Sequence, residues 1–135
     1  MSVATSSARA WVAPAFIKLA VLYFLIGVVL GNYMGATMDF GLRSVHAHIN
    51  LLGWASLALA GVIYSVYPSA ANSRLALWHF WIAAFVLPVM FIALAMFMRG
   101  MQAVGPVLGA TSAAMALAVL LFAVNVFRNV GPKSA

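Results

Sequence analysis

Residues 43–54 read RSVHAHINLLGW and place two of the chain's three histidines at the head of a long apolar run. An imidazole inside a membrane segment is costly to leave without a partner, so histidines there are candidates for function. Because an α-helix turns about 100° per residue, His46 and His48 are predicted to point toward nearly opposite faces of one helix. Two histidines that bind one metal ion from one helix lie four residues apart. This pair is therefore predicted to serve two different neighbours.

The composition is typical of an integral membrane protein. Of the 135 residues, 67% are hydrophobic and 6% are charged, whereas a soluble domain carries about 25% charged residues. The chain has no cysteine, which excludes disulfides, iron–sulfur clusters and covalent c-type haem attachment. Its net charge of +6 comes from cations that stand singly at segment ends. Such cations are typical topology signals, so we expect no nucleic-acid partner.

Four apolar runs are long enough to cross a hydrocarbon core of ~30 Å, which takes about 20 helical residues. The predicted fold is all-α, one transmembrane domain over residues 1–135 with helices near 15–34, 45–67, 75–98 and 103–127. Cytoplasmic loops carry an excess of Lys and Arg, so both termini are predicted to be cytoplasmic. The cations on that side are Arg9, Lys18, Arg74, Arg128 and Lys133, and those on the outer side are Arg43 and Arg99.

The third histidine is predicted to lie on the other side of the membrane. His48 and Tyr67 are nineteen residues apart, which corresponds to roughly 28 Å of helix, and His79 begins the next helix. His79 is therefore too far away to share a metal with the pair. We expect it to be a polar anchor at the interface, beside Trp78 and Trp81, and the alternative is a second cofactor site.

The first predicted helix carries a stripe of small residues. Gly27, Gly31 and Gly35 follow one another at intervals of four. Such a stripe lets another helix approach closely. Two interpretations stay open, packing within one four-helix unit and contact between subunits.

The histidine pair has three interpretations. Hydrogen-bonded packing residues are the simplest. A bare zinc or copper ion needs more ligands than the sequence provides near the pair, because the chain has no glutamate or cysteine. Haem needs only one or two axial imidazoles, and its apolar face suits a membrane interior. Its propionates need cations at the membrane surface, and Arg43 and Arg99 are predicted to lie on the same outer side as the histidines.

The run from Arg43 to Leu51, with His48-Ile49-Asn50-Leu51, resembles the second helix of subunit I in haem-copper oxidases and nitric oxide reductases. In those proteins an Arg-x-x-His-x-Asn-Leu type of pattern supplies a low-spin haem ligand. Arg43 lies further upstream than in that pattern. Residues 18–24, KLAVLYF, are similar to the first helix of the same subunit, and the resemblance covers roughly residues 14–68. It is closest to small stand-alone bacterial proteins described as oxidase subunit I-like.

The resemblance implies a haem b protein of the bacterial inner membrane. Subunit I has twelve helices in three arcs of four, and one of its late helices carries neighbouring histidines that bind two different haems. A four-helix chain would reproduce this arrangement as a homotrimer, with one His46 and one His48 at each haem. The expected haem-site residues are the axial ligands His46 and His48, the propionate partners Arg43 and Arg99, and the nearby packing residues Asn50 and Trp54.

The same resemblance implies electron transfer or the sensing of haem or gas rather than catalysis. Full oxidases add three histidines for copper and a cross-linked tyrosine, and nitric oxide reductases add a glutamate-containing iron site. This chain has neither a further histidine cluster nor a glutamate, so we expect no copper or non-haem iron site and no catalytic residue. The alternative is a cofactor-free structural or assembly subunit of a respiratory oxidase or nitric oxide reductase.

Overall fold

Four long helices form the protein in the computed structural model, which describes residues 9–131. The second of them has three consecutive parts, and two short helices lie in connections. Each long helix is long and apolar enough to cross a membrane, which indicates a multi-pass membrane protein. The elements are α1 (Val12–Thr37), α2 (Arg43–His48), η1 (Ile49–Ser56), α3 (Leu57–Val66), α4 (Pro68–Ala71), α5 (Arg74–Met98), η2 (Gln102–Val104) and α6 (Gly105–Asn129).

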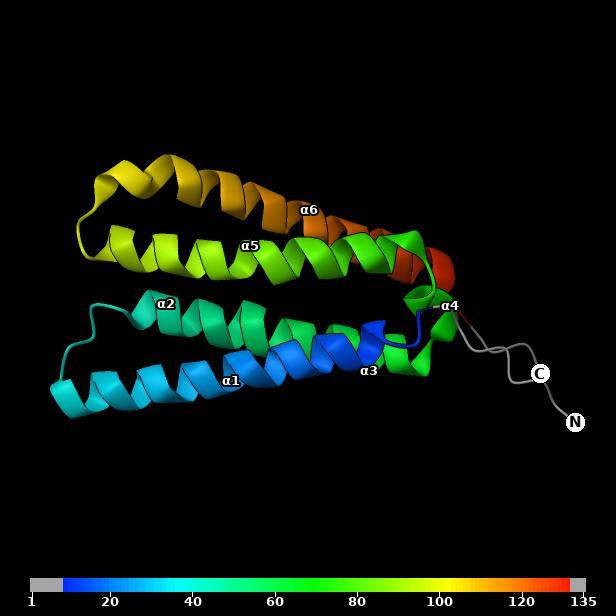
Figure 1. The fold of residues 1–135 in the computed structure, drawn as a ribbon, viewed down its shortest axis with the longest axis horizontal. Helices are drawn as coiled ribbons and strands as arrows, with labels where there is room; N and C mark the ends of the chain where they lie inside the picture. Colours follow the sequence, from blue (N-terminus) through cyan, green and yellow to red (C-terminus); the bar gives the residue numbers. More distant parts are fainter. Residues whose placement is uncertain (1–8, 132–135) are drawn as a thin grey trace, which may run out of the picture.

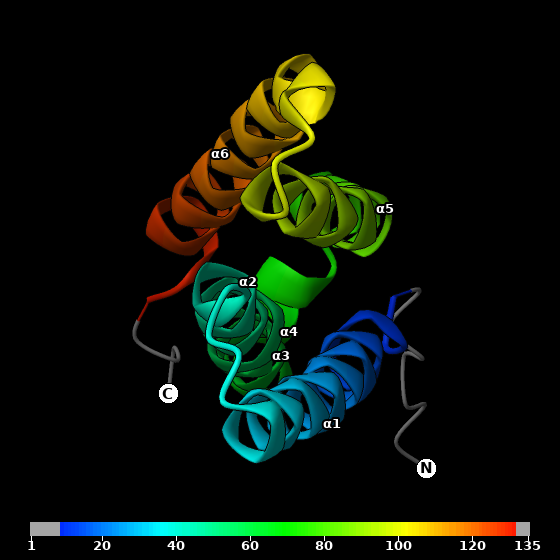
Figure 2. The same ribbon diagram turned by 90° about the vertical axis from the view of Figure 1, so that its left-hand side faces the viewer.

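The long helices form two antiparallel hairpins (Figure 1). One hairpin pairs α1 with the continuous run of α2, η1 and α3, and the other pairs α5 with α6. Seen end-on, α5 lies between α6 and the first hairpin (Figure 2). The start of α1 and the end of α6 lie together at what we call the terminal end. The connections 38–42 and 99–104 lie at the opposite, loop end.

Local chemistry accounts for the ends of the helices. Pro68 occupies the first turn of α4, where its missing N–H removes no hydrogen bond. The Ser73 hydroxyl caps α5 by accepting a hydrogen bond from the Ala76 N–H at 3.1 Å. Gly100 follows α5 with a φ of 93°, a conformation that glycine adopts without strain. The four predicted spans are confirmed as helices, and their observed ends differ from the predicted ends by a few residues.

The second long helix contains a π-helical segment that the sequence analysis did not predict. The segment η1 begins directly after His48 and covers eight residues. Within it, the Ser56 hydroxyl donates to the carbonyl of Leu51 at 2.8 Å. π-helical turns are rare and are frequent at functional sites, so the wider turn marks the residues that follow the histidine pair.

Aromatic rings join the two hairpins. The Phe16 ring of α1 lies 5.2 Å from that of Phe80 on α5, and the Tyr23 ring of α1 lies 5.3 Å from that of Phe91 on α5. Both pairs have edge-to-face geometry. Such pairs stabilise packing beyond the area that they bury. The core therefore runs along α1, α3 and α5. Helix α6 packs on α5 and, toward its own end, on Tyr64 of α3.

Two of the three glycines on α1 provide close packing within the chain. A Cβ added at Gly27 would lie 2.6 Å from Asn50 Nδ2, and one added at Gly31 would lie 2.9 Å from His46 Cε1. A Cβ at Gly35 would meet no atom within 4 Å. The first two positions thus let α1 approach the histidine-bearing helix, as the interpretation of packing within one unit expects.

Alanine substitutions distinguish these glycines. We expect Gly31→Ala to lower the free energy of unfolding by about 1–3 kcal/mol, the usual cost of overpacking, because the added methyl group displaces the His46 ring. The matched control, Gly35→Ala, should leave stability unchanged or raise it slightly through helix propensity. Unfolding of both variants in detergent micelles measures the difference, and equal stabilities would contradict the packing described for Gly31.

Candidate functional site

His46 lies on the face of α2 that packs against α1. Its Nδ1 is 3.0 Å from the carbonyl oxygen of Gly27 and 3.4 Å from Asn50 Nδ2. The same Asn50 amide donates to the His46 carbonyl oxygen at 2.8 Å, which is the better contact for its hydrogen. Because a carbonyl oxygen only accepts hydrogen bonds, Nδ1 of His46 carries a proton and donates it to Gly27.

His48 is exposed and points away from α1. Its Nδ1 lies 2.7 Å from the carbonyl oxygen of Ser44, one turn earlier in the same helix. This oxygen also only accepts, so Nδ1 of His48 is the donor as well. In the neutral form of both rings, the proton is on Nδ1 and the lone pair is on Nε2.

The two Nε2 atoms are available to a ligand from outside the chain. Neither atom has a hydrogen-bond partner within residues 9–131, and that of His46 is not sealed beneath other atoms. Histidines that bind metals typically donate the other ring N–H to a carbonyl or carboxylate, which fixes the tautomer and raises the basicity of the ligating nitrogen. Both histidines have this arrangement.

The two arginines expected near the site differ in their partners. Arg99 forms an ion pair with Asp39 at 2.8 Å and thereby joins the two connections of the loop end. The pKa of Asp39 is lowered, first by the hydrogen bond from the Gly41 N–H and then by Arg99. Arg43 is exposed and has no ion-pair partner in the described part of the chain. Exposed ion pairs contribute about 0–1 kcal/mol, so Arg99 can change partners at low cost.

Asn50 and Trp54 pack between the helices of the first hairpin. Asn50 lies against Gly27 and is hydrogen-bonded to the His46 carbonyl. The Trp54 ring lies 4.8 Å from that of Phe24 on α1. Both residues thus support the helix face that carries His46, and neither is free to reach far from it.

A second polar cluster lies at the terminal end, where the sequence predicted an interfacial anchor. His79 is only 5% exposed, whereas Trp78 and Trp81 are exposed. The prediction for His79 is therefore wrong. Its ring packs 4.7 Å from Phe16 and 5.2 Å from Phe122, because a lone imidazole in an apolar span is stabilised by facing the protein interior and a partner there.

Asn125 completes the hydrogen bonds of this second cluster. Its amide nitrogen donates to the Tyr64 hydroxyl at 3.3 Å and to the Ala70 carbonyl at 3.0 Å. The Tyr64 hydroxyl is in turn hydrogen-bonded to Nδ1 of His79 at 3.1 Å. The Asn125 carbonyl oxygen accepts from Ser73 and Asn129. The cluster thus ties α3, α5 and α6 together, and sequence analysis overlooked Tyr64 and Asn125.

The two polar clusters differ in what they offer to a ligand. Aromatic rings surround His79, whereas His48 is exposed and His46 reaches the surface at the loop end. No family model matches this chain, and no curated protein or solved structure matches it either. The loop-end pair, His46 and His48, is the candidate site because His48 is exposed and His46 is only partly buried, with no hydrogen-bond partner for either Nε2 within residues 9–131.

The terminal cluster predicts a stability difference between two tyrosines. Tyr64→Phe removes a hydroxyl that bonds both His79 and Asn125, and we expect it to lower the free energy of unfolding by about 1–3 kcal/mol. Tyr33→Phe is the matched control, because the Tyr33 side chain is exposed and its hydroxyl makes no hydrogen bond within residues 9–131. Unfolding in micelles tests this. A Tyr64 variant as stable as the Tyr33 variant would show that the cluster contributes nothing.

Proposed function

We propose that the chain is a membrane haem b protein that holds haem between subunits, with His46 from one chain and His48 from another. The observation that carries the proposal is the pair of Nδ1–H···O=C bonds, to Gly27 and to Ser44. In the neutral form of each ring these bonds place the lone pair on Nε2, and Nε2 has no hydrogen-bond partner within residues 9–131. The resemblance of residues 43–51 to a haem-binding helix supports the same ligands.

The chemistry of these residues fits a haem b. When bound, the group supplies reversible one-electron transfer at its iron. The chain would supply two imidazole nitrogens, whose basicity the carbonyl acceptors raise. Arg43 would be available for a propionate, and Arg99 would take one in exchange for Asp39. Asn50 and Trp54 pack against α1 and would hold in place the helix that carries His46.

A bridging haem follows from the directions of the two rings. His46 packs against α1 of its own chain, whereas His48 is exposed on the outside of the same helix. One chain therefore does not bring both nitrogens to one iron. A closed homotrimer of twelve helices would give each interface one His46 and one His48. We place it in the bacterial inner membrane with both termini cytoplasmic, because more of the cations lie at the terminal end.

Electron transfer, or the sensing of haem or gas, is the proposed activity. Because two imidazoles would hold the haem iron, a small gas would have to displace one of them to bind. Within residues 9–131 no three His, Cys, Asp or Glu side chains gather where they could hold a second metal ion. Asp39 is paired with Arg99, and His79 is at the terminal end. We assign no catalytic residue.

A second function is favoured by one observation. The His46 ring lies over Gly31 and bonds Gly27 within its own chain, as a plain packing residue would. A cofactor-free structural or assembly subunit of a respiratory oxidase or nitric oxide reductase would need no more than this. Such a subunit has no use for the exposed imidazole of His48, which is why we prefer the haem protein.

Optical spectra of the purified protein distinguish the two. We expect the reduced protein to show the sharp α and β bands of low-spin, six-coordinate haem b, because two imidazoles bind the iron. His46→Ala and His48→Ala should each abolish these bands. His79→Gln, the matched control at the terminal end, should keep them.

Two outcomes would contradict the assignment. A folded but colourless protein after haem reconstitution would favour the cofactor-free subunit. A high-spin spectrum that readily binds carbon monoxide would mean that only one imidazole binds the iron.

Mixed assemblies test whether haem is shared between chains. Neither single variant forms an intact site alone, but an equal mixture of His46→Ala and His48→Ala chains regains complete interfaces. Random mixing in a closed ring restores about a quarter of them, so about a quarter of the wild-type low-spin haem should return. Absorbance after co-refolding measures it. No recovery from two folded variants would rule out a haem shared by one His46 and one His48.

A further inference from the structure

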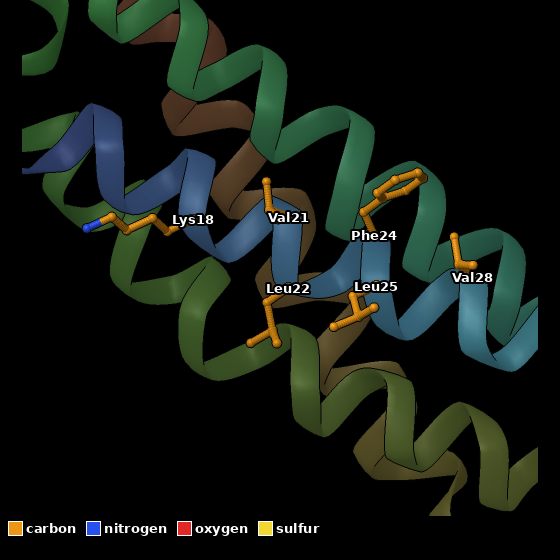
Figure 3. A pocket seen from close by; sticks show the side chains of 6 residues that line it. All are labelled: Lys18, Val21, Leu22, Phe24, Leu25 and Val28. Carbon is orange, nitrogen blue, oxygen red and sulfur yellow. The ribbon is translucent and has the colours of Figure 1, made fainter.

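A shallow hollow of about 540 Å³ lies on the outer side of α1 (Figure 3). Every residue that lines it comes from α1, and one of them is charged. Figure 3 shows the Lys18 amine extending toward the start of the helix, away from the apolar side chains. The lining residues are Lys18, Val21, Leu22, Phe24, Leu25 and Val28.

The length of the hollow corresponds to one leaflet of a bilayer. Lys18 and Val28 are ten residues apart, a rise of about 15 Å. Half of a hydrocarbon core of ~30 Å is the same length. A lysine in this position lays its stem along the apolar surface and holds its ammonium group at the interface. The hollow therefore combines an apolar surface long enough for an acyl chain with the Lys18 ammonium at the depth of the lipid headgroups.

The chain provides no acidic side chain to neutralise this lysine. Asp39 is the only acidic residue of the sequence, and it lies at the loop end in an ion pair with Arg99. Lys18 is exposed at the terminal end and has no ion-pair partner within residues 9–131. Anionic lipid headgroups attract basic side chains near the membrane surface.

A neighbouring hollow gives an internal comparison. It continues along α1 toward the loop end, has a volume of about 610 Å³, and is lined by Leu25, Ile26, Val29, Leu30 and Tyr33. This second hollow has no charged side chain. An acyl chain fits either surface, but only the one beside Lys18 can select a headgroup by its charge.

We propose that the hollow beside Lys18 binds an anionic phospholipid. One acyl chain lies along the apolar side chains from Val21 to Val28, and the phosphate contacts the Lys18 ammonium. The charge of the headgroup, rather than the acyl chain, gives this site its preference.

Photo-cross-linking identifies the occupant directly. The chain has no cysteine, so Leu25→Cys can carry a benzophenone at a unique position. Leu59→Cys on α3 is the matched control, because the two leucines are 60% and 63% exposed. Both labelled proteins are irradiated in vesicles of equal parts phosphatidylglycerol and phosphatidylcholine, and adduct masses are compared. We expect phosphatidylglycerol to be enriched at residue 25 and not at residue 59.

Charge variants test the role of the lysine. Adding Lys18→Gln to the labelled protein should reduce phosphatidylglycerol capture about fivefold, the contribution of one lysine near an anionic surface. Lys18→Arg should keep the capture, which separates loss of charge from loss of fold. Arg128→Gln, which removes an exposed cation from α6 at the same end, should have no effect.

Three results would overturn the proposal. Equal capture of both lipids at residue 25 would show that charge plays no part. An equal loss with Lys18→Gln and Arg128→Gln would show only a general surface potential. Adducts between two protein chains would assign the hollow to a second copy instead of a lipid.

Discussion

The hydrogen bond from His46 Nδ1 to the Gly27 carbonyl, 3.0 Å long, is the interaction on which the candidate site depends. In an apolar span an imidazole N–H needs an acceptor, and this one is found on the neighbouring helix. The bond requires α1 to approach closely, which a Cβ at Gly31 would prevent because it would lie 2.9 Å from His46 Cε1. It also sets the tautomer, and so leaves Nε2 as the atom with a free lone pair. The one hydrogen bond thus accounts both for the close packing of α1 on α2 and for the free lone pair on Nε2 of His46.

The need of an imidazole for a hydrogen-bond partner in an apolar span has a different result at the terminal end. There the Tyr64 hydroxyl and the Asn125 amide give His79 a partner inside the protein, and the three polar side chains become part of the core. At the loop end, His48 is satisfied by a carbonyl of its own helix and stays exposed. The difference in burial therefore separates His79, which is part of the core, from His48, which is a candidate ligand.

Much of the fold was predictable, because hydropathy and helix length identify apolar spans without tertiary information. The divergence of His46 and His48 was predictable as well, since it depends only on the helical turn angle. The π-helical segment η1 was not, because no local pattern in residues 49–56 differs from an ordinary helix. The burial of His79 was missed because its network includes Tyr64 and Asn125, residues far apart in sequence that only the packed hairpins bring together. The partner of Arg99 was missed for the same reason, as Asp39 lies sixty residues earlier.

Native mass spectrometry of the haem-loaded protein in detergent tests the central claim most directly, because it reports subunit number and haem number in one spectrum. If His46 and His48 of different chains share each iron, the protein should appear as a closed ring of three chains with one haem b per chain. Haem should leave when the ring dissociates into monomers. A monomer that keeps its haem and its six-coordinate, low-spin spectrum would contradict the claim.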